Sequence, residues 1–146
     1  MMTINKRVVN MKKYNSVLVV DDFKPTAWTI MRQLQNDGYD AEMCTSPESA
    51  INMVLNSDKK YDLIILDLIL NGINGPELSR KFKGKSDIIF ITGALDGTSV
   101  IKEATKEGWP VILKDFDPKS FVESITKNKV TDFAKKQVKK EEAFKE

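Results

Sequence analysis

The chain lacks histidine altogether and carries a single cysteine, Cys44, among its 146 residues. The absence of histidine excludes a His–Cys zinc site, a Ser-His-Asp triad and a phosphohistidine carried by the chain itself. A lone cysteine cannot build an internal disulfide framework, which favours a reducing and therefore cytoplasmic location. We expect Cys44 to pack as a small apolar residue.

An excess of charge of one sign and long apolar runs are also missing. The chain has 23 basic and 21 acidic residues, and its formal charge of +2 is too close to neutral to indicate a nucleic-acid or membrane partner. The apolar runs are far shorter than a membrane span, and residues 1–16 lack the continuous apolar core of a secretory signal. We therefore expect no membrane insertion and no direct contact with nucleic acid.

Strand and helix patterns alternate along the chain. Apolar runs predict strands at 16–20, 40–44, 62–66, 87–91 and 111–113, and helices are predicted to begin near residues 25, 47, 76, 98 and 118. Strands that are apolar at every position are typical of a parallel sheet covered on both faces. The pattern predicts an α/β fold: a doubly wound, five-stranded parallel sheet with helices on both faces, a flavodoxin-like (βα)5 arrangement.

The length predicts one domain, which we expect to span residues 16–130. Residues 1–15 are expected to form an N-terminal extension. The lysine-rich segment 131–146 is expected to extend the last helix or to form a charged tail.

Polar residues follow the apolar runs at the strand ends. Asp21 and Asp22 follow the first run, Asp67 follows the third, Thr92 the fourth and Lys114 the fifth. Because parallel strands bring their carboxyl ends to one edge of the sheet, these side chains should converge at the edge where open α/β sheets bind ligands. Three close carboxylates repel one another unless a cation compensates, and such a set of oxygens suits Mg²⁺.

This set of residues resembles the response-regulator receiver domain of two-component signalling. The resemblance also covers the motifs VLVVDD at 17–22, LIILDLILNGINGPEL at 63–78, IIFITG at 88–93 and LKDFDPKSF at 113–121. It implies that Asp67 accepts a phosphoryl group as an aspartyl phosphate and that Lys114 and Thr92 bind the phosphoryl oxygens. It further implies a Mg²⁺ site formed by Asp21, Asp22, Asp67 and the backbone carbonyl of Ile69.

The same resemblance implies the partners. A histidine kinase or a histidine phosphotransfer protein would donate the phosphoryl group, and an unknown downstream protein would receive the signal. Because the sequence contains no recognisable output module, we expect a stand-alone regulator that signals by protein–protein contact. We expect it not to be an enzyme beyond self-phosphorylation and slow autodephosphorylation.

Two departures from the family pattern bear on switching. Asp115 stands where proline usually follows the lysine, so a trans bond is expected there. Val111 occupies the position of the aromatic switch residue, and Trp109 is expected to pack under the loop rather than to replace that switch. These departures leave a phosphorylation-independent pseudo-receiver as an alternative. A phosphohydrolase of the haloacid-dehalogenase type is disfavoured, because Ile69 stands where that class has its second acid.

Overall fold

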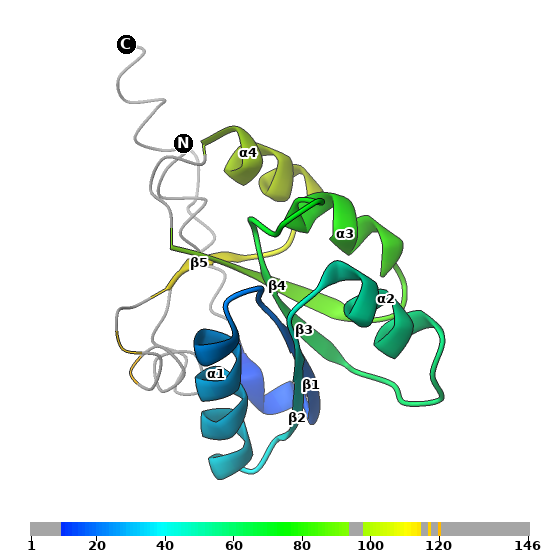
Figure 1. The fold of residues 1–146 in the computed structure, drawn as a ribbon, viewed down its shortest axis with the longest axis vertical. Helices are drawn as coiled ribbons and strands as arrows, with labels where there is room; N and C mark the ends of the chain where they lie inside the picture. Colours follow the sequence, from blue (N-terminus) through cyan, green and yellow to red (C-terminus); the bar gives the residue numbers. More distant parts are fainter. Residues whose placement is uncertain (1–9, 94–97, 115–116, 118–119, 121–146) are drawn as a thin grey trace, which may run out of the picture.

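The computed structural model describes residues 10–93, 98–114, 117 and 120 of the chain. Within these residues one parallel sheet forms in the order β2-β1-β3-β4-β5 (Figure 1). Its strands are β1 (Ser16–Val20), β2 (Asp40–Cys44), β3 (Leu63–Asp67), β4 (Asp87–Thr92) and β5 (Val111–Leu113). The predicted five-stranded parallel sheet is confirmed.

Two strands differ slightly from the predicted bounds. The prediction placed β3 at 62–66 and ended β4 at 91, whereas Asp67 and Thr92 are the last residues of their strands. Asp62 lies outside β3, where its carboxylate accepts hydrogen bonds from the N–H groups of Asn15 and Ser16, both at 3.0 Å. Asp67 pairs with Ile91 across the sheet, so the sheet register itself fixes where the Asp67 side chain emerges.

Four α-helices are present in the described ranges: α1 (Lys24–Asn36), α2 (Pro47–Leu55), α3 (Gly75–Lys81) and α4 (Thr98–Glu107). The first three each carry a proline in the first turn, where a missing N–H costs nothing. None of the helices in the described part of the chain is long and apolar enough to cross a membrane. Apart from residue 120, the helix predicted from residue 118 lies outside the described residues, as does the segment 131–146.

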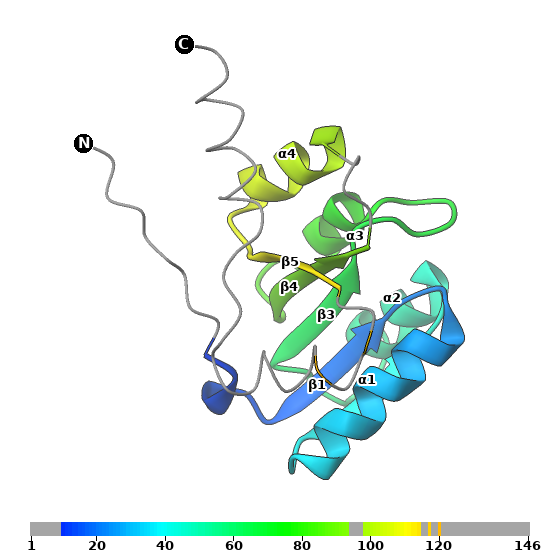
Figure 2. The same ribbon diagram turned by 90° about the vertical axis from the view of Figure 1, so that its left-hand side faces the viewer.

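The sheet separates two apolar cores, because successive strand residues point to opposite faces. On one face, Leu18, Ile64 and Phe90 pack with residues of α2, α3 and α4. On the other face, Val19 and Ile65 pack with the buried side of α1 (Figures 1 and 2). Helices therefore cover both faces of the sheet, as a doubly wound fold requires.

The core between the sheet and helices α2, α3 and α4 confirms that Cys44 and Trp109 are packing residues. Cys44 is a free thiol, 7% exposed, and packs among the apolar residues. Burial raises the pKa of this thiol to about 11, so it remains protonated and unreactive at neutral pH. Trp109 is half-buried and packs against the same core.

A short 3₁₀ turn, Met11–Lys13, precedes the sheet and packs against it. Met11 is 0% exposed and belongs to the core beneath α1. Its carbonyl accepts a hydrogen bond of 3.2 Å from the Tyr39 hydroxyl, and the Tyr14 hydroxyl donates one of 2.7 Å to Asp87 at the start of β4. The residues just before β1 are thus tied to both α1 and β4.

Candidate functional site

Four strands bring the predicted site residues to the carboxyl edge of the sheet. Asp21 directly follows β1, Asp67 ends β3, Thr92 ends β4 and Lys114 directly follows β5. The backbone N–H of Lys114 donates to the carbonyl of Thr92 at 2.7 Å, so the β4–β5 pairing continues into the site. Thr92 is 1% exposed at this position.

Three carboxylates gather at this edge. Asp21, Asp22 and Asp67 each offer an oxygen, and these oxygens all lie within 4.8 Å of one another. Asp21 is 0% exposed and Asp67 is 6% exposed. The Phe23 N–H donates to Oδ1 of Asp21 at 2.9 Å, and the Ile69 N–H donates to Oδ1 of Asp67 at 3.2 Å. These backbone bonds fix the orientation of both buried acids.

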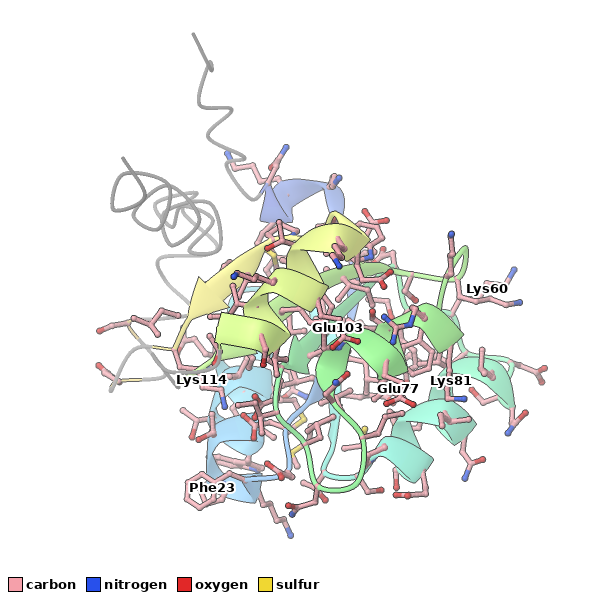
Figure 3. The ribbon with its side chains drawn as sticks, turned by 90° about the horizontal axis from the view of Figure 1, so that it is seen from above. Phe23, Lys60, Glu77, Lys81, Glu103 and Lys114 are labelled. Carbon is pink, nitrogen blue, oxygen red and sulfur yellow. The ribbon has the colours of Figure 1, made fainter. Side chains whose placement is uncertain are left out.

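Lys114 joins the two buried acids. Its Nζ lies 2.8 Å from Oδ2 of Asp21 and 2.9 Å from Oδ2 of Asp67. Burial alone would lower the pKa of Lys114, but the hydrogen bond to Asp21 and the charge of Asp67 outweigh it and raise the pKa. Lys114 is therefore charged at neutral pH and is positioned by two acids at once. Figure 3 shows Lys114 at the end of β5.

For Asp67, unlike Lys114, the effect of burial on the pKa outweighs the effect of the ion pair. Burial, and then the nearby charge of Asp21, raise the pKa of Asp67 to about 6, although Lys114 and the Ile69 N–H favour the ionised form. One ammonium cannot fully compensate the carboxylates around it. The ionised site is thus held in the fold at a cost in free energy.

The residues fit a divalent cation. When ionised, three carboxylates and one ammonium leave two uncompensated negative charges at the site. Hard carboxylate oxygens at this spacing are the ligands that Mg²⁺ prefers, with water completing its shell. Asp21, Asp22 and Asp67 would hold the ion, and the Ile69 carbonyl remains a predicted further ligand.

The deficit of positive charge predicts a pH-dependent stability in metal-free buffer. Because the pKa of Asp67 is about 6 in the fold and about 4 in an unfolded chain, the folded state binds more protons between these values. The free energy of unfolding should therefore fall by about 2 kcal/mol as the pH rises from 4 to above 6. Chemical denaturation of the native chain and of Asp67→Asn should diverge over this window, with the variant more stable above pH 6. Asp58→Asn, at an exposed acid, should follow the native chain; parallel curves for all three proteins would contradict the prediction.

A close backbone contact supports Asp67 from behind. Gly75, the first residue of α3, donates its N–H to the carbonyl of Leu68 at 2.7 Å. A Cβ added at Gly75 would lie 2.6 Å from the backbone oxygen of Asp67 and 2.9 Å from the Cα of Leu68. Sequence analysis missed this contact. The sequence Asn-Gly-Pro predicts a loop, but it does not reveal which backbone lies against the glycine.

Substitution of Gly75 by alanine should therefore damage the fold and the site together. Both obstructing atoms belong to the backbone and cannot rotate away, so we expect Gly75→Ala to cost about 3 kcal/mol of stability. Gly72→Ala is the matched control: nothing lies within 4 Å of its added Cβ, and only its φ of +90° opposes the change, at about 1 kcal/mol. Urea denaturation of both variants measures the difference. Equal costs would mean that the loop shifts freely behind Asp67.

Three exposed apolar side chains lie close in sequence to the site residues. Phe23 is 62% exposed, Ile69 48% and Leu113 37%, and each lies within two residues of a site residue. Figure 3 shows Phe23 projecting outward from the start of α1. Ile69 leaves no second acid two residues after Asp67, which is the position that a dehalogenase-type phosphohydrolase would need.

Comparison with known proteins agrees with this geometry. The sequence profile of the response regulator receiver domain matches residues 17–126, and the chain belongs to this family. Among curated proteins, it is 29% identical over 111 residues to the DNA-binding response regulator MtrA of Mycobacterium tuberculosis, covering 75% of this chain and 48% of MtrA. It is also 29% identical over 102 residues to the regulatory protein VanRB of Enterococcus faecalis, covering 68% of this chain and 46% of VanRB. The chain spans about half the length of these relatives.

Solved structures give the same fold. A response regulator receiver protein from Burkholderia phymatum superposes with a TM-score of 0.64 at 29% identity, covering 78% of this chain and 94% of that one. The response regulator TrrA of Thermotoga maritima, solved in complex with Mg²⁺ and BeF, superposes with a TM-score of 0.63 at 24% identity. That match covers 78% of this chain and 98% of TrrA.

Proposed function

We propose that this chain is a response-regulator receiver domain that accepts a phosphoryl group on Asp67 and signals by protein–protein contact. The observation that carries the proposal is the Lys114 ammonium, held between two buried aspartates beside a third acid. This arrangement places fixed positive charge and a carboxylate nucleophile at one point, which is what transfer of an anionic phosphoryl group requires.

In the proposed transfer, a carboxylate oxygen of Asp67 forms a bond to phosphorus while the bond from phosphorus to the donor breaks. The donor keeps the electron pair of the broken bond. Lys114 is in place to bind a phosphoryl oxygen, and the Thr92 hydroxyl is proposed to bind another when the loaded site draws it inward. Bound Mg²⁺ would neutralise charge on the transferred group.

We propose that the donor is a histidine kinase or a histidine phosphotransfer protein. The exposed side chains of Phe23, Ile69 and Leu113 support a protein partner, because each is an exposed apolar residue within two positions of a residue of the buried anionic site. The chain itself would act as a signalling receiver and not as an enzyme on other substrates. Its near-neutral charge and its buried, protonated cysteine support a cytoplasmic location and a downstream partner that is protein and not nucleic acid.

A second function is favoured by Val111, which is 0% exposed at the start of β5. A buried valine cannot swing between buried and exposed positions as an aromatic ring can. This supports a pseudo-receiver that binds its partner without phosphorylation. The expected trans bond between Lys114 and Asp115 bears on the same alternative, but Asp115 lies outside the described residues.

Intact-mass measurement distinguishes the two functions. We expect one phosphoryl adduct after incubation with acetyl phosphate and Mg²⁺, and we expect its loss when a chelator replaces the metal. The adduct should be labile in base, as an acyl phosphate is. No adduct at saturating donor and Mg²⁺ would favour the pseudo-receiver.

A further inference from the structure

An amide side chain connects the loop behind Asp67 with helix α4. Asn74 caps α3: its Oδ1 accepts the Glu77 N–H at 2.8 Å. Its Nδ2 donates to Oε2 of Glu103, on α4, at 3.2 Å. Because the cap needs an oxygen and the carboxylate needs a donor, both contacts require the same orientation of the amide.

The other oxygen of Glu103 continues the connection. Arg80, on α3, donates to Oε1 of Glu103 at 3.1 Å and to Oε1 of Glu107 at 2.8 Å. Figure 3 shows Glu103 at the junction of α4 and α3, whereas Glu77 and Lys81 lie on α3 away from α4. We call Asn74, Arg80, Glu103 and Glu107 the α3–α4 network.

The network is also connected to the site. Asn74 pairs with Ile69 in an antiparallel bridge, and the Ile69 N–H is the donor to Oδ1 of Asp67. The next residue, Gly75, is fixed against the backbone of Asp67. A movement of this loop relative to α4 must therefore change the distance between Asn74 and Glu103, the surroundings of Asp67, or both.

From these contacts we propose that Asn74 is a positioning residue that couples occupancy of the Asp67 site to helix α4 through Glu103. The inference goes beyond the proposed function and rests on it only for the identity of the site ligand. Coupling between two sites is reciprocal. If a ligand at Asp67 shifts the conformational equilibrium of α4 by a given factor, the same shift made on α4 must change the affinity for the ligand by that factor. The side chains of Glu103 and Arg80 are 34% and 45% exposed, so added salt should weaken the coupling.

A swap of donor and acceptor tests the link. Asn74→Asp keeps the capping oxygen but replaces the donor by a second carboxylate facing Glu103. Adding Glu103→Gln supplies a donor from the other side and should restore the link in reversed polarity. Glu77→Gln is the control matched to Glu103→Gln, since it removes one carboxylate charge from a side chain outside the α3–α4 network.

The readout is the NMR response of α4 amides to beryllofluoride with Mg²⁺. In the native chain and in Glu77→Gln, we expect signals near Asp67 and on α4 to shift together. In Asn74→Asp, signals near Asp67 should still shift, the α4 response should shrink, and affinity should fall about fivefold. The double variant, Asn74→Asp with Glu103→Gln, should recover most of the α4 response and most of the affinity. High salt should reduce the difference between the native chain and Asn74→Asp. An unchanged α4 response in Asn74→Asp, or no recovery in the double variant, would overturn the inference.

A second measurement needs no ligand at the site. In the ligand-free protein, Glu103→Ala should speed amide exchange of Ile69, whose N–H is bonded to Asp67, while α4 itself stays folded. Unchanged exchange at Ile69 would overturn the coupling even if phosphorylation proceeds. Failure of the native chain to bind beryllofluoride, with faster exchange at Ile69 in Glu103→Ala, would instead reject the proposed function and keep the coupling.

Discussion

Asp67→Asn should abolish formation of the phosphoryl adduct. The amide has an NH₂ group in place of one carboxylate oxygen and keeps nearly the same size, but it cannot act as the nucleophile. Asp67 ends a fully buried central strand, and its carboxylate contacts both Lys114 and the Ile69 N–H. In the described part of the chain, no other carboxylate makes both contacts. Intact mass after incubation with acetyl phosphate and Mg²⁺ measures the result.

Two controls accompany this variant. Asp58→Asn, at an exposed acid remote from the site elements, should be phosphorylated like the native chain. A denaturation curve should establish that Asp67→Asn is folded, and in metal-free buffer at neutral pH we expect it to be the more stable protein. A base-stable adduct that persists in Asp67→Asn would mean that a residue other than Asp67 is modified.

Lys114→Ala should have the second large effect, on stability in the absence of metal. Removing the ammonium leaves Asp21, which is 0% exposed, without its ion pair, and also withdraws the positive charge nearest to Asp67. Loss of one partner from a buried ion pair costs about 3 kcal/mol or more. Thermal or urea denaturation in chelator should detect this loss.

Added Mg²⁺ should restore part of that stability, because the ion supplies positive charge among the same carboxylates. The restoration should be larger in Lys114→Ala than in the native chain. Lys60→Ala, on an exposed residue with no ion pair among the described residues, should change stability by less than about 0.5 kcal/mol. If Lys114→Ala behaves like Lys60→Ala, the lysine does not compensate the buried acids.

Much of the architecture could be predicted because the strands are apolar at every position. Runs such as residues 63–66 indicate a strand buried on both faces, and the order of strands and helices then implies a parallel doubly wound sheet. The convergence of Asp21, Asp67, Thr92 and Lys114 follows from the same topology, since each lies where a parallel strand ends. The prediction began β3 one residue too early, at Asp62, whose carboxylate accepts hydrogen bonds from the backbone before β1.

The features that sequence analysis missed depend on contacts between distant segments. Nothing local to Gly75 reveals that its Cα approaches the Asp67 backbone, and nothing local to Asn74 identifies Glu103 as its partner 29 residues later. Likewise, Met11 lies in a polar stretch whose composition resembles a loose end, yet the methionine is buried under α1. Such contacts arise only when the elements have been packed against one another.

The buried methionine has a consequence for where this protein can be shortened. A polypeptide that starts at the first strand would expose the apolar pocket under α1 that Met11 fills and would free the Asp87 carboxylate from Tyr14. The match to the family model begins at residue 17, whereas Met11, six residues earlier, is already part of the core. A shortened protein whose first residue is chosen from the family match alone would therefore lack part of the hydrophobic core. The apolar surface exposed in this way would favour aggregation.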